Sequence, residues 1–147
     1  MHRSIEELAL SFRRACERVQ LEQHDPFSHF PRGACGDASL LLSKFLRKHG
    51  FEEITYVCGV ASEEDDIRSH AWLEIEGLLV DVTADQFPNH PGPPVLVTRD
   101  RSWHAHFRET DRFRADVDAY DAITRARFSS IYRDVVQHVP AELRGGS

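Results

Sequence analysis

The spacing of apolar residues predicts helices near both ends of the chain and strands between them. In residues 4–22 apolar side chains recur every three or four positions, and Ser4 and Glu7 have the spacing of a capping box that begins a helix. The same periodicity predicts a second helix over about 35–49 and a third over about 116–139. Each of these helices is expected to bury its apolar face.

The middle of the chain has the composition of β-strands. Residues 54–60 are rich in β-branched side chains, and residues 69–76 and 78–84 alternate apolar with polar positions on either side of a Glu-Gly pair. Residues 95–98 are a further short apolar run. We therefore expect four strands, of which the second and third form a hairpin with a two-residue turn.

Three segments between these elements are predicted to be loops. Residues 23–34 carry proline and glycine breakers, residues 62–66 are an acidic stretch expected to be solvated, and residues 87–94 are rich in proline. The acidic stretch lacks the spacing and the glycine of a calcium loop. Because no internal repeat or second domain is visible, we predict one domain over residues 1–147.

The predicted hairpin brings a histidine next to a carboxylate. A turn at its Glu-Gly pair would set Ile75 opposite Leu78, and alternation would then give one entirely apolar face. The other face would carry His70, Trp72 and Asp81, with the imidazole and the carboxylate as diagonal neighbours. A slip of one residue would bury the polar set, so the pattern specifies the register.

Cys35 has the surroundings of a nucleophile. It opens the second predicted helix, whose first N–H groups and dipole favour an anion, and glycines on both sides allow a tight turn. Its own N–H is placed to donate to a developing oxyanion. We expect Asp37, also in the first turn, to point away toward backbone amides. The competing interpretation is that Cys35 is an ordinary buried cysteine at the start of a helix. For Cys16 and Cys58 we expect only a packing role.

Composition sets broad limits on the function. The chain has 147 residues and a formal net charge of -6, and no apolar run nears the roughly 20 residues of a membrane helix. These features argue against nucleic-acid binding and against a membrane protein. The three cysteines cannot all pair and none lies in a Cys-x-x-Cys step, so neither a disulfide framework nor a cysteine-rich zinc site is expected. Unpaired thiols and the lack of a signal peptide predict a cytoplasmic location.

Three short motifs in a fixed order resemble the transglutaminase-like branch of the papain-like superfamily. The motifs are Cys-Gly-Asp at residues 35–37, His-Ala-Trp-Leu-Glu at residues 70–74 and Asp-Val-Thr at residues 81–83, within a match of about residues 31–86. The resemblance implies an α+β fold, in which an antiparallel sheet packs against the helix that carries the nucleophile and further helices flank this core. It implies that Cys35 is the nucleophile, His70 the general base and then acid, and Asp81 the group that orients the imidazole.

The resemblance also implies acyl chemistry through a thioester, either hydrolysis of an amide or peptide bond or transfer of the acyl group to an amine. It implies no cofactor and no metal, and a peptide, a protein or a small amide as substrate. Papain-like enzymes carry a glutamine oxyanion donor six residues before the cysteine, where this chain has His29. We name His29, Gln86 and Trp72 as candidates for donating to the oxyanion or lining the cleft. Several small family members are leader-peptide or toxin-type proteases.

Two other classes of function remain open at this point. The chain is alternatively a catalytically inactive binding or scaffold protein on the same fold, or a metal site formed by Cys35, His70 and Asp81. The alternating histidines His104 and His106 suggest a strand that could bind metal, although we favour a solvated edge or a wall of the cleft. The sequence names neither the substrate nor the oligomeric state.

Overall fold

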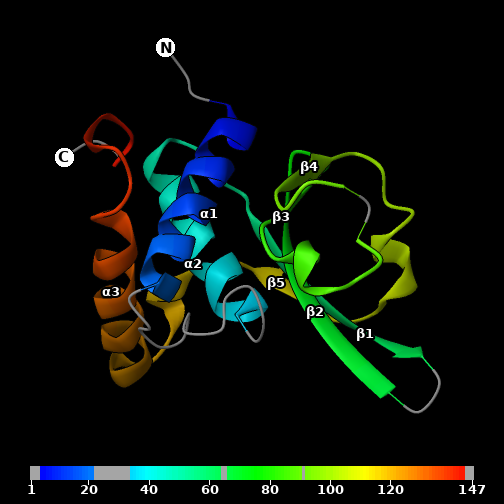
Figure 1. Cartoon of the computed structure of the whole chain (residues 1–147). Coiled ribbons are helices and arrows are strands. Elements are labelled where there is room, and N and C mark those ends of the chain that lie inside the picture. Colours follow the sequence, from blue (N-terminus) through cyan, green and yellow to red (C-terminus); the bar gives the residue numbers. More distant parts are fainter. Residues whose placement is uncertain (1–3, 22–33, 64–65, 91, 145–147) are drawn as a thin grey trace.

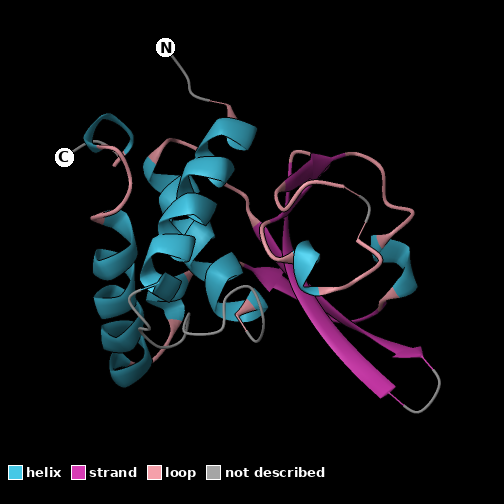
Figure 2. Ribbon diagram, in the orientation of Figure 1, coloured by secondary structure: helices cyan, strands magenta, loops and turns pink. Residues whose placement is uncertain are grey.

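The computed structural model describes residues 4–21, 34–63, 66–90 and 92–144. The described residues form three α-helices and one antiparallel sheet, which confirms the predicted α+β fold. The helices lie together on one side of the sheet, and the loops that follow β3 cover its other side (Figures 1 and 2). The helices are α1 (Ile5–Leu21), α2 (Cys35–Lys48) and α3 (Ala122–Val136).

The sheet has five strands in the order β4-β3-β2-β1-β5. Every neighbouring pair is antiparallel. The strands are β1 (Thr55–Glu63), β2 (Asp66–Ile75), β3 (Leu78–Asp81), β4 (Leu96–Thr98) and β5 (Arg108–Arg114). Because β2 lies in the centre, both of its edges pair with neighbouring strands.

The predicted hairpin is present in the predicted register. Ile75 pairs with Leu78 and Leu73 with Val80 across β2 and β3. The two turn residues both have positive φ, 53° at Glu76 and 81° at Gly77, as the type I′ turns that suit such hairpins require. The apolar face of the hairpin packs against the helices, so the alternation read from the sequence is confirmed.

The first two helices also begin as their sequences predict. The N–H of Glu7 donates to the Ser4 hydroxyl at 3.0 Å, which is one half of the expected capping box. The second helix begins at Cys35, and its chain leaves through Gly50, whose φ of 92° favours glycine. The predicted packing of Cys16 is confirmed, because its side chain is fully buried among the helices.

The structure corrects two predicted boundaries and adds one strand. The acidic stretch is not simply a loop, because β1 continues to Glu63 and β2 already begins at Asp66 in one long hairpin. The third helix begins at Ala122, where the Asp121 side chain accepts from the Thr124 N–H at 2.8 Å and caps it. The fifth strand, β5, was not predicted, because as an exposed edge strand it carries mostly charged residues and lacks apolar alternation.

Two clusters of buried side chains lie on opposite faces of the sheet. The larger one joins all three helices to one face and is mainly aliphatic. The smaller one, which we call the aromatic cluster, is covered by the loops after β3 and β4; it consists of Val57, Trp72, Leu79, Phe87 and Phe107, with Ala61 and Trp103 packed against it. The second face of the hairpin is therefore buried as well.

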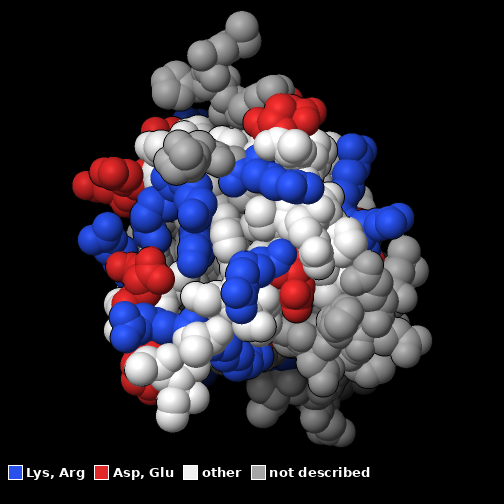
Figure 3. Space-filling view, turned by 90° about the vertical axis from the view of Figure 1, so that its left-hand side faces the viewer, with Lys and Arg blue, Asp and Glu red and all other residues white. Residues whose placement is uncertain are grey.

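The surface charge is unevenly distributed. Seen from the side of the helices, Lys and Arg side chains gather over much of the face although the chain as a whole is acidic (Figure 3). Four of them, Lys44, Lys48, Arg133 and Arg144, line a hollow between α2 and α3. Among the described residues, no helix is both long and apolar enough to cross a membrane.

Candidate functional site

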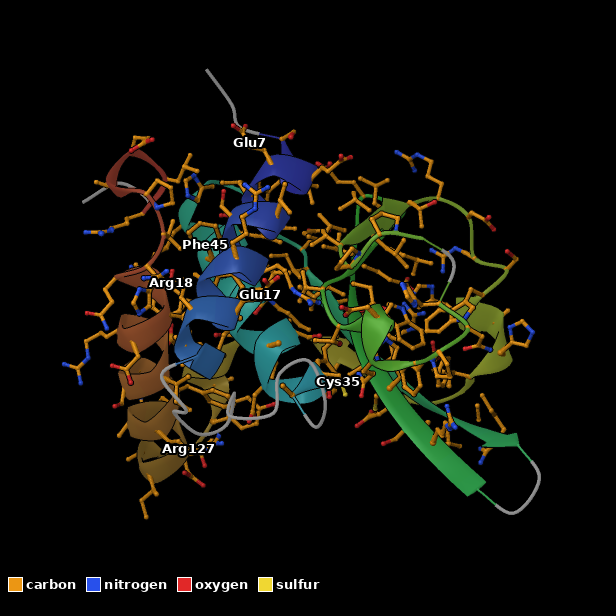
Figure 4. The ribbon with its side chains drawn as sticks, in the orientation of Figure 1. Glu7, Glu17, Arg18, Cys35, Phe45 and Arg127 are labelled. Carbon is orange, nitrogen blue, oxygen red and sulfur yellow. The ribbon has the colours of Figure 1, made fainter. Side chains whose placement is uncertain are left out.

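Cys35 is the first residue of α2 and lies at the end of this helix that meets the sheet (Figure 4). Its side chain is half-buried. Ala34 precedes it, and no side chain caps the helix. The N-terminal N–H groups of α2 therefore have no side-chain partner among the described residues and are placed to stabilise negative charge at this position.

His70 and Asp81 form a buried pair on the second face of the hairpin. The Nε2 atom of His70 lies 2.6 Å from the Asp81 Oδ2 atom, and each residue is 1% exposed. The predicted proximity of the imidazole and the carboxylate is thus confirmed. Cys35 also acts on this imidazole, because its side chain contributes to the raised pKa of His70.

The environment favours the charged form of both members of the pair. Burial alone would lower the pKa of His70, but the charge and hydrogen bond of Asp81, and more weakly Cys35, raise that pKa to about 9. Burial alone would raise the pKa of Asp81, yet the His70 charge and the hydrogen bonds from His104 and His70 hold it well below its usual range. An imidazolium beside an ionised carboxylate is the favoured state at neutral pH.

A second histidine binds the same carboxylate. The Nε2 atom of His104 lies 2.7 Å from the Oδ2 atom of Asp81, and His104 is 3% exposed. The prediction of a strand with both histidines at a solvated edge or cleft wall is wrong. Residues His104–His106 form a 3-10 turn that sends His104 inward, whereas His106 stays exposed. The sequence pattern around His104 and His106 does not indicate which of the two is buried.

Aromatic rings enclose the His70 imidazole. The ring centroids of Phe87, Phe107 and Trp72 lie 5.0, 5.4 and 5.6 Å from that of His70, and Trp103 follows at 5.8 Å. Rings at these distances exclude water from the imidazole, and an aromatic ring that turns its face to an imidazolium stabilises the charge. The aromatic cluster is therefore the immediate environment of the histidine–carboxylate pair.

Comparison with protein families gives this arrangement a context. A family model described as the transglutaminase-like superfamily matches residues 1–89, which is more than half of the chain. The chain belongs to the transglutaminase-like superfamily. The matched span includes Cys35, His70 and Asp81, and it ends before His104. No curated protein and no solved structure matches the chain.

The residues predicted to donate to the oxyanion or to line the cleft differ in their surroundings. Gln86 closes the 3-10 turn Ala84–Gln86, and its Nε2 atom lies 3.5 Å from the His70 Nδ1 atom and 3.1 Å from the Thr83 carbonyl oxygen. Trp72 is 4% exposed within the aromatic cluster, so it packs behind His70 and has little surface left for a substrate. His29 lies outside the described residues.

The turn that carries Gln86 is tied to the first helix. Arg13 of α1 is buried and donates to the Val82 carbonyl oxygen at 2.7 Å and to both carboxylate oxygens of Asp85 at 2.7 and 2.8 Å. A two-pronged guanidinium–carboxylate contact of this kind fixes orientation as well as distance. The position of Gln86 beside His70 is therefore set by α1.

Asp37 is directed away from the thiol. Its Oδ2 atom accepts a hydrogen bond from Arg127 of α3 at 3.1 Å. The predicted direction is confirmed, but the partner is a guanidinium and not the backbone amides that we expected. This ion pair draws a negative charge in the first turn of α2 away from the position where a transglutaminase-like nucleophile would ionise.

One group of described residues has the composition of a metal site. Ligand atoms of His70, Asp81 and His104 lie within 4.8 Å of one another, and two histidines with a carboxylate are donors that zinc uses. In this arrangement both imidazoles already bond to the Asp81 Oδ2 atom. A metal at this point would have to replace both of these hydrogen bonds. The direct bonds account for the cluster without an ion.

Proposed function

We propose that the chain is a cysteine-dependent hydrolase or acyltransferase that acts on an amide or peptide bond through a thioester. The observation that carries this proposal is the buried His70–Asp81 pair, with Cys35 at the start of α2 contributing to the raised pKa of the imidazole. Membership of the transglutaminase-like superfamily supports it. A peptide, a protein or a small amide would be the substrate, and free cysteines fit a cytoplasmic setting.

The reaction would begin with the Cys35 proton on the Nδ1 atom of His70. The thiolate sulfur would bond to the carbonyl carbon while the carbonyl electron pair moves to oxygen, which the Cys35 N–H stabilises. Gln86, whose Nε2 atom lies next to His70, supports the choice of this side chain as a second donor. The carbon–nitrogen bond then breaks, and the leaving amine takes the His70 proton.

The second half of the reaction would return the enzyme to its starting state. Water or an amine would give a proton to His70 and attack the thioester, and the carbon–sulfur bond would break. Hydrolysis and acyl transfer share every step except the identity of this nucleophile. Asp81 would stay ionised throughout, because its role is to hold the imidazole and stabilise its charge.

Alkylation of the three cysteines by iodoacetamide tests the proposal. Cys35 and Cys58 are both half-buried, so Cys58 is a matched control for accessibility within the same molecule. At about pH 6, where an ordinary thiol is almost wholly protonated, we expect Cys35 to react at least about tenfold faster than Cys58. Peptide mapping by mass spectrometry gives the rate at each site. His70→Gln should remove the difference.

Equal rates at Cys35 and Cys58 at this pH would contradict an activated thiolate and favour a binding or scaffold protein on the same fold. If Cys35 is activated, mass spectrometry of acyl groups attached to it after incubation with cell extract would identify the substrate class. Cys35→Ala supplies the background for that measurement, and Cys58→Ala shows whether the second thiol contributes.

A further inference from the structure

The Asp81 carboxylate is held at three points. Its Oδ2 atom accepts hydrogen bonds from His70 at 2.6 Å and from His104 at 2.7 Å, and its Oδ1 atom accepts the Thr83 N–H at 3.0 Å. Since the carboxylate is ionised, each imidazole nitrogen that faces it must carry a proton. Both histidines therefore present Nε2–H to Asp81, so that Nδ1 of His70 is the nitrogen that would exchange a proton with the thiol in the proposed function.

Among the described residues, the His104 ring makes no hydrogen bond other than the one to Asp81. It packs edge-on against Trp72 and Trp103, with ring centroids 4.8 Å away in each case. Its Nδ1 atom is buried and has no hydrogen-bond partner in the described parts of the chain. A buried polar atom without a partner costs stability, so an apolar ring would suit this pocket better if packing alone mattered. The bond to Asp81 is what the imidazole adds.

We propose that His104 is a positioning residue that fixes the Asp81 carboxylate and limits how tightly it holds the His70 proton. Two donors on one oxygen share its electron density, so each bond is weaker than it would be alone. Without His104, Asp81 would stabilise the His70 imidazolium more strongly. The imidazolium would then release its proton to the leaving amine less readily. This inference rests on the proposed function, and it assigns a role to a residue outside the span that the family model matches.

The groups that face His70 come from several elements. Cys35 approaches from α2, Asp81 from β3 and His104 from the 3-10 turn before β5. Gln86, which is uncharged, lies with its Nε2 atom 3.5 Å from the His70 Nδ1 atom. The His70 and His104 rings are stacked with centroids 6.2 Å apart, and the hydrogen-bonded link between them is the Asp81 carboxylate. Removal of the His104 N–H should therefore change the proton affinity of His70 through Asp81.

The test compares His104→Phe, His104→Gln and His106→Phe in the full chain. Phenylalanine keeps a ring in the pocket but removes the N–H, whereas glutamine can return an N–H to about the place of Nε2. His106 is the matched control, because it lies two residues away, is exposed and bonds to the Trp103 carbonyl oxygen. The readout is the titration of the His70 ring, followed by NMR of its nitrogens.

For His104→Phe we expect an upward shift of the His70 titration midpoint of about one pH unit, a tenfold change in proton affinity. His104→Gln should restore the midpoint to near that of the unchanged protein, and His106→Phe should leave it unaltered. A folded His104→Phe variant with an unchanged midpoint would overturn the proposal. A role in packing alone would lower stability without moving this midpoint.

A measurement on the unaltered protein keeps the inference testable if His104→Phe does not fold. Ring-nitrogen NMR should show His104 with its proton on Nε2 and a bare Nδ1. A proton on Nδ1 alone would overturn the proposal, since Nε2 could then not donate to Asp81. None of these readouts needs catalysis. If Cys35 is unreactive but the His70 midpoint shifts in His104→Phe, only the proposed function is contradicted. If Cys35 is reactive but the midpoint does not shift, only the role of His104 is contradicted.

Discussion

The two faces of the sheet bury their side chains in different ways. On the helical face, apolar side chains of α1, α2 and α3 form one continuous core with the apolar side of the hairpin, and buried polar side chains are few. On the opposite face, aromatic rings from β2 and from the loops after β3 and β4 surround three polar groups: His70, Asp81 and His104. The first arrangement stabilises the fold, and the second holds a charged cluster.

This difference shows how one sheet serves two purposes. Aliphatic packing is non-directional and depends mainly on the area and volume buried. The aromatic cluster excludes water from the imidazole and strengthens its bonds to the carboxylate, because hydrogen bonds are stronger where the local dielectric is low. Changes in the helical core should therefore alter stability, and changes in the aromatic cluster should alter the titration of His70.

Truncation of Phe45 is the change with the largest expected effect. Phe45 is fully buried in α2 and packs on Phe12 with ring centroids 5.4 Å apart. Phe45→Ala should lower the free energy of unfolding by about 3–5 kcal/mol, through lost burial and the cavity left behind. Urea denaturation measures this loss.

The matched change on the other face is Phe87→Leu. It keeps an apolar side chain but removes the ring 5.0 Å from His70. We expect a loss of stability of about 1–2 kcal/mol together with a downward shift in the pKa of His70, since the imidazolium loses an aromatic neighbour. Equal losses of stability at both sites, with no shift in His70 for either, would contradict the division of roles between the two faces.

The pH dependence of stability is a subtler test of the same division. The pKa of His70 is raised in the folded protein to about 9, above its ordinary value of about 6.5. The folded state therefore binds this proton more tightly than the unfolded state. The resulting stabilisation is complete below about pH 6.5 and is lost as the pH rises through about 9.

Urea midpoints between about pH 6.5 and 9 should fall in the unaltered protein. In His70→Gln they should fall much less. Cys35→Ser should keep most of the decline, because Asp81 raises the pKa of His70 more than Cys35 does. A decline that disappears in Cys35→Ser but persists in His70→Gln would mean that the thiol, and not the histidine–carboxylate pair, governs this range.

The sequence predicted the parts of the molecule that follow a regular period. The hairpin register, and with it the contact of His70 with Asp81, depends on strict alternation between two apolar strands. The starts of α1 and α2 depend on local signals that act within one turn. The path of a loop has no such period, so nothing near His104 indicated that this residue turns inward to meet a carboxylate 23 positions earlier.

Long-range polar contacts were missed for the same reason. Arg13 lies on a helix whose apolar periodicity does not predict the contact of its guanidinium with Asp85, 72 positions later. The charged edge strand β5 carries no apolar alternation, and its place beside β1 is decided by backbone pairing. Sequence reasoning therefore brought His70 and Asp81 together, whereas the contacts of Arg13 and His104 around them required the structure.

The smallest expected effect concerns the ion pair between Arg127 of α3 and Asp37, which lies in the first turn of the helix that begins at Cys35. The Arg127 and Asp37 side chains are 50% and 26% exposed, so their ion pair should contribute less than about 1 kcal/mol to stability. Arg127→Ala should leave the urea midpoint nearly unchanged. It should slow alkylation of Cys35 at about pH 6 by no more than about threefold, because Asp37 loses the cation that offsets its charge near a developing thiolate. Arg125→Ala, at an exposed position of the same helix, is the control. About 0.5 M salt should abolish the difference, since it shortens the screening length to a few ångströms.

Faster alkylation of Cys35 in Arg127→Ala would show that Asp37 does not oppose the thiolate. A loss of tenfold or more in the alkylation rate would show that the helical layer shapes the site directly.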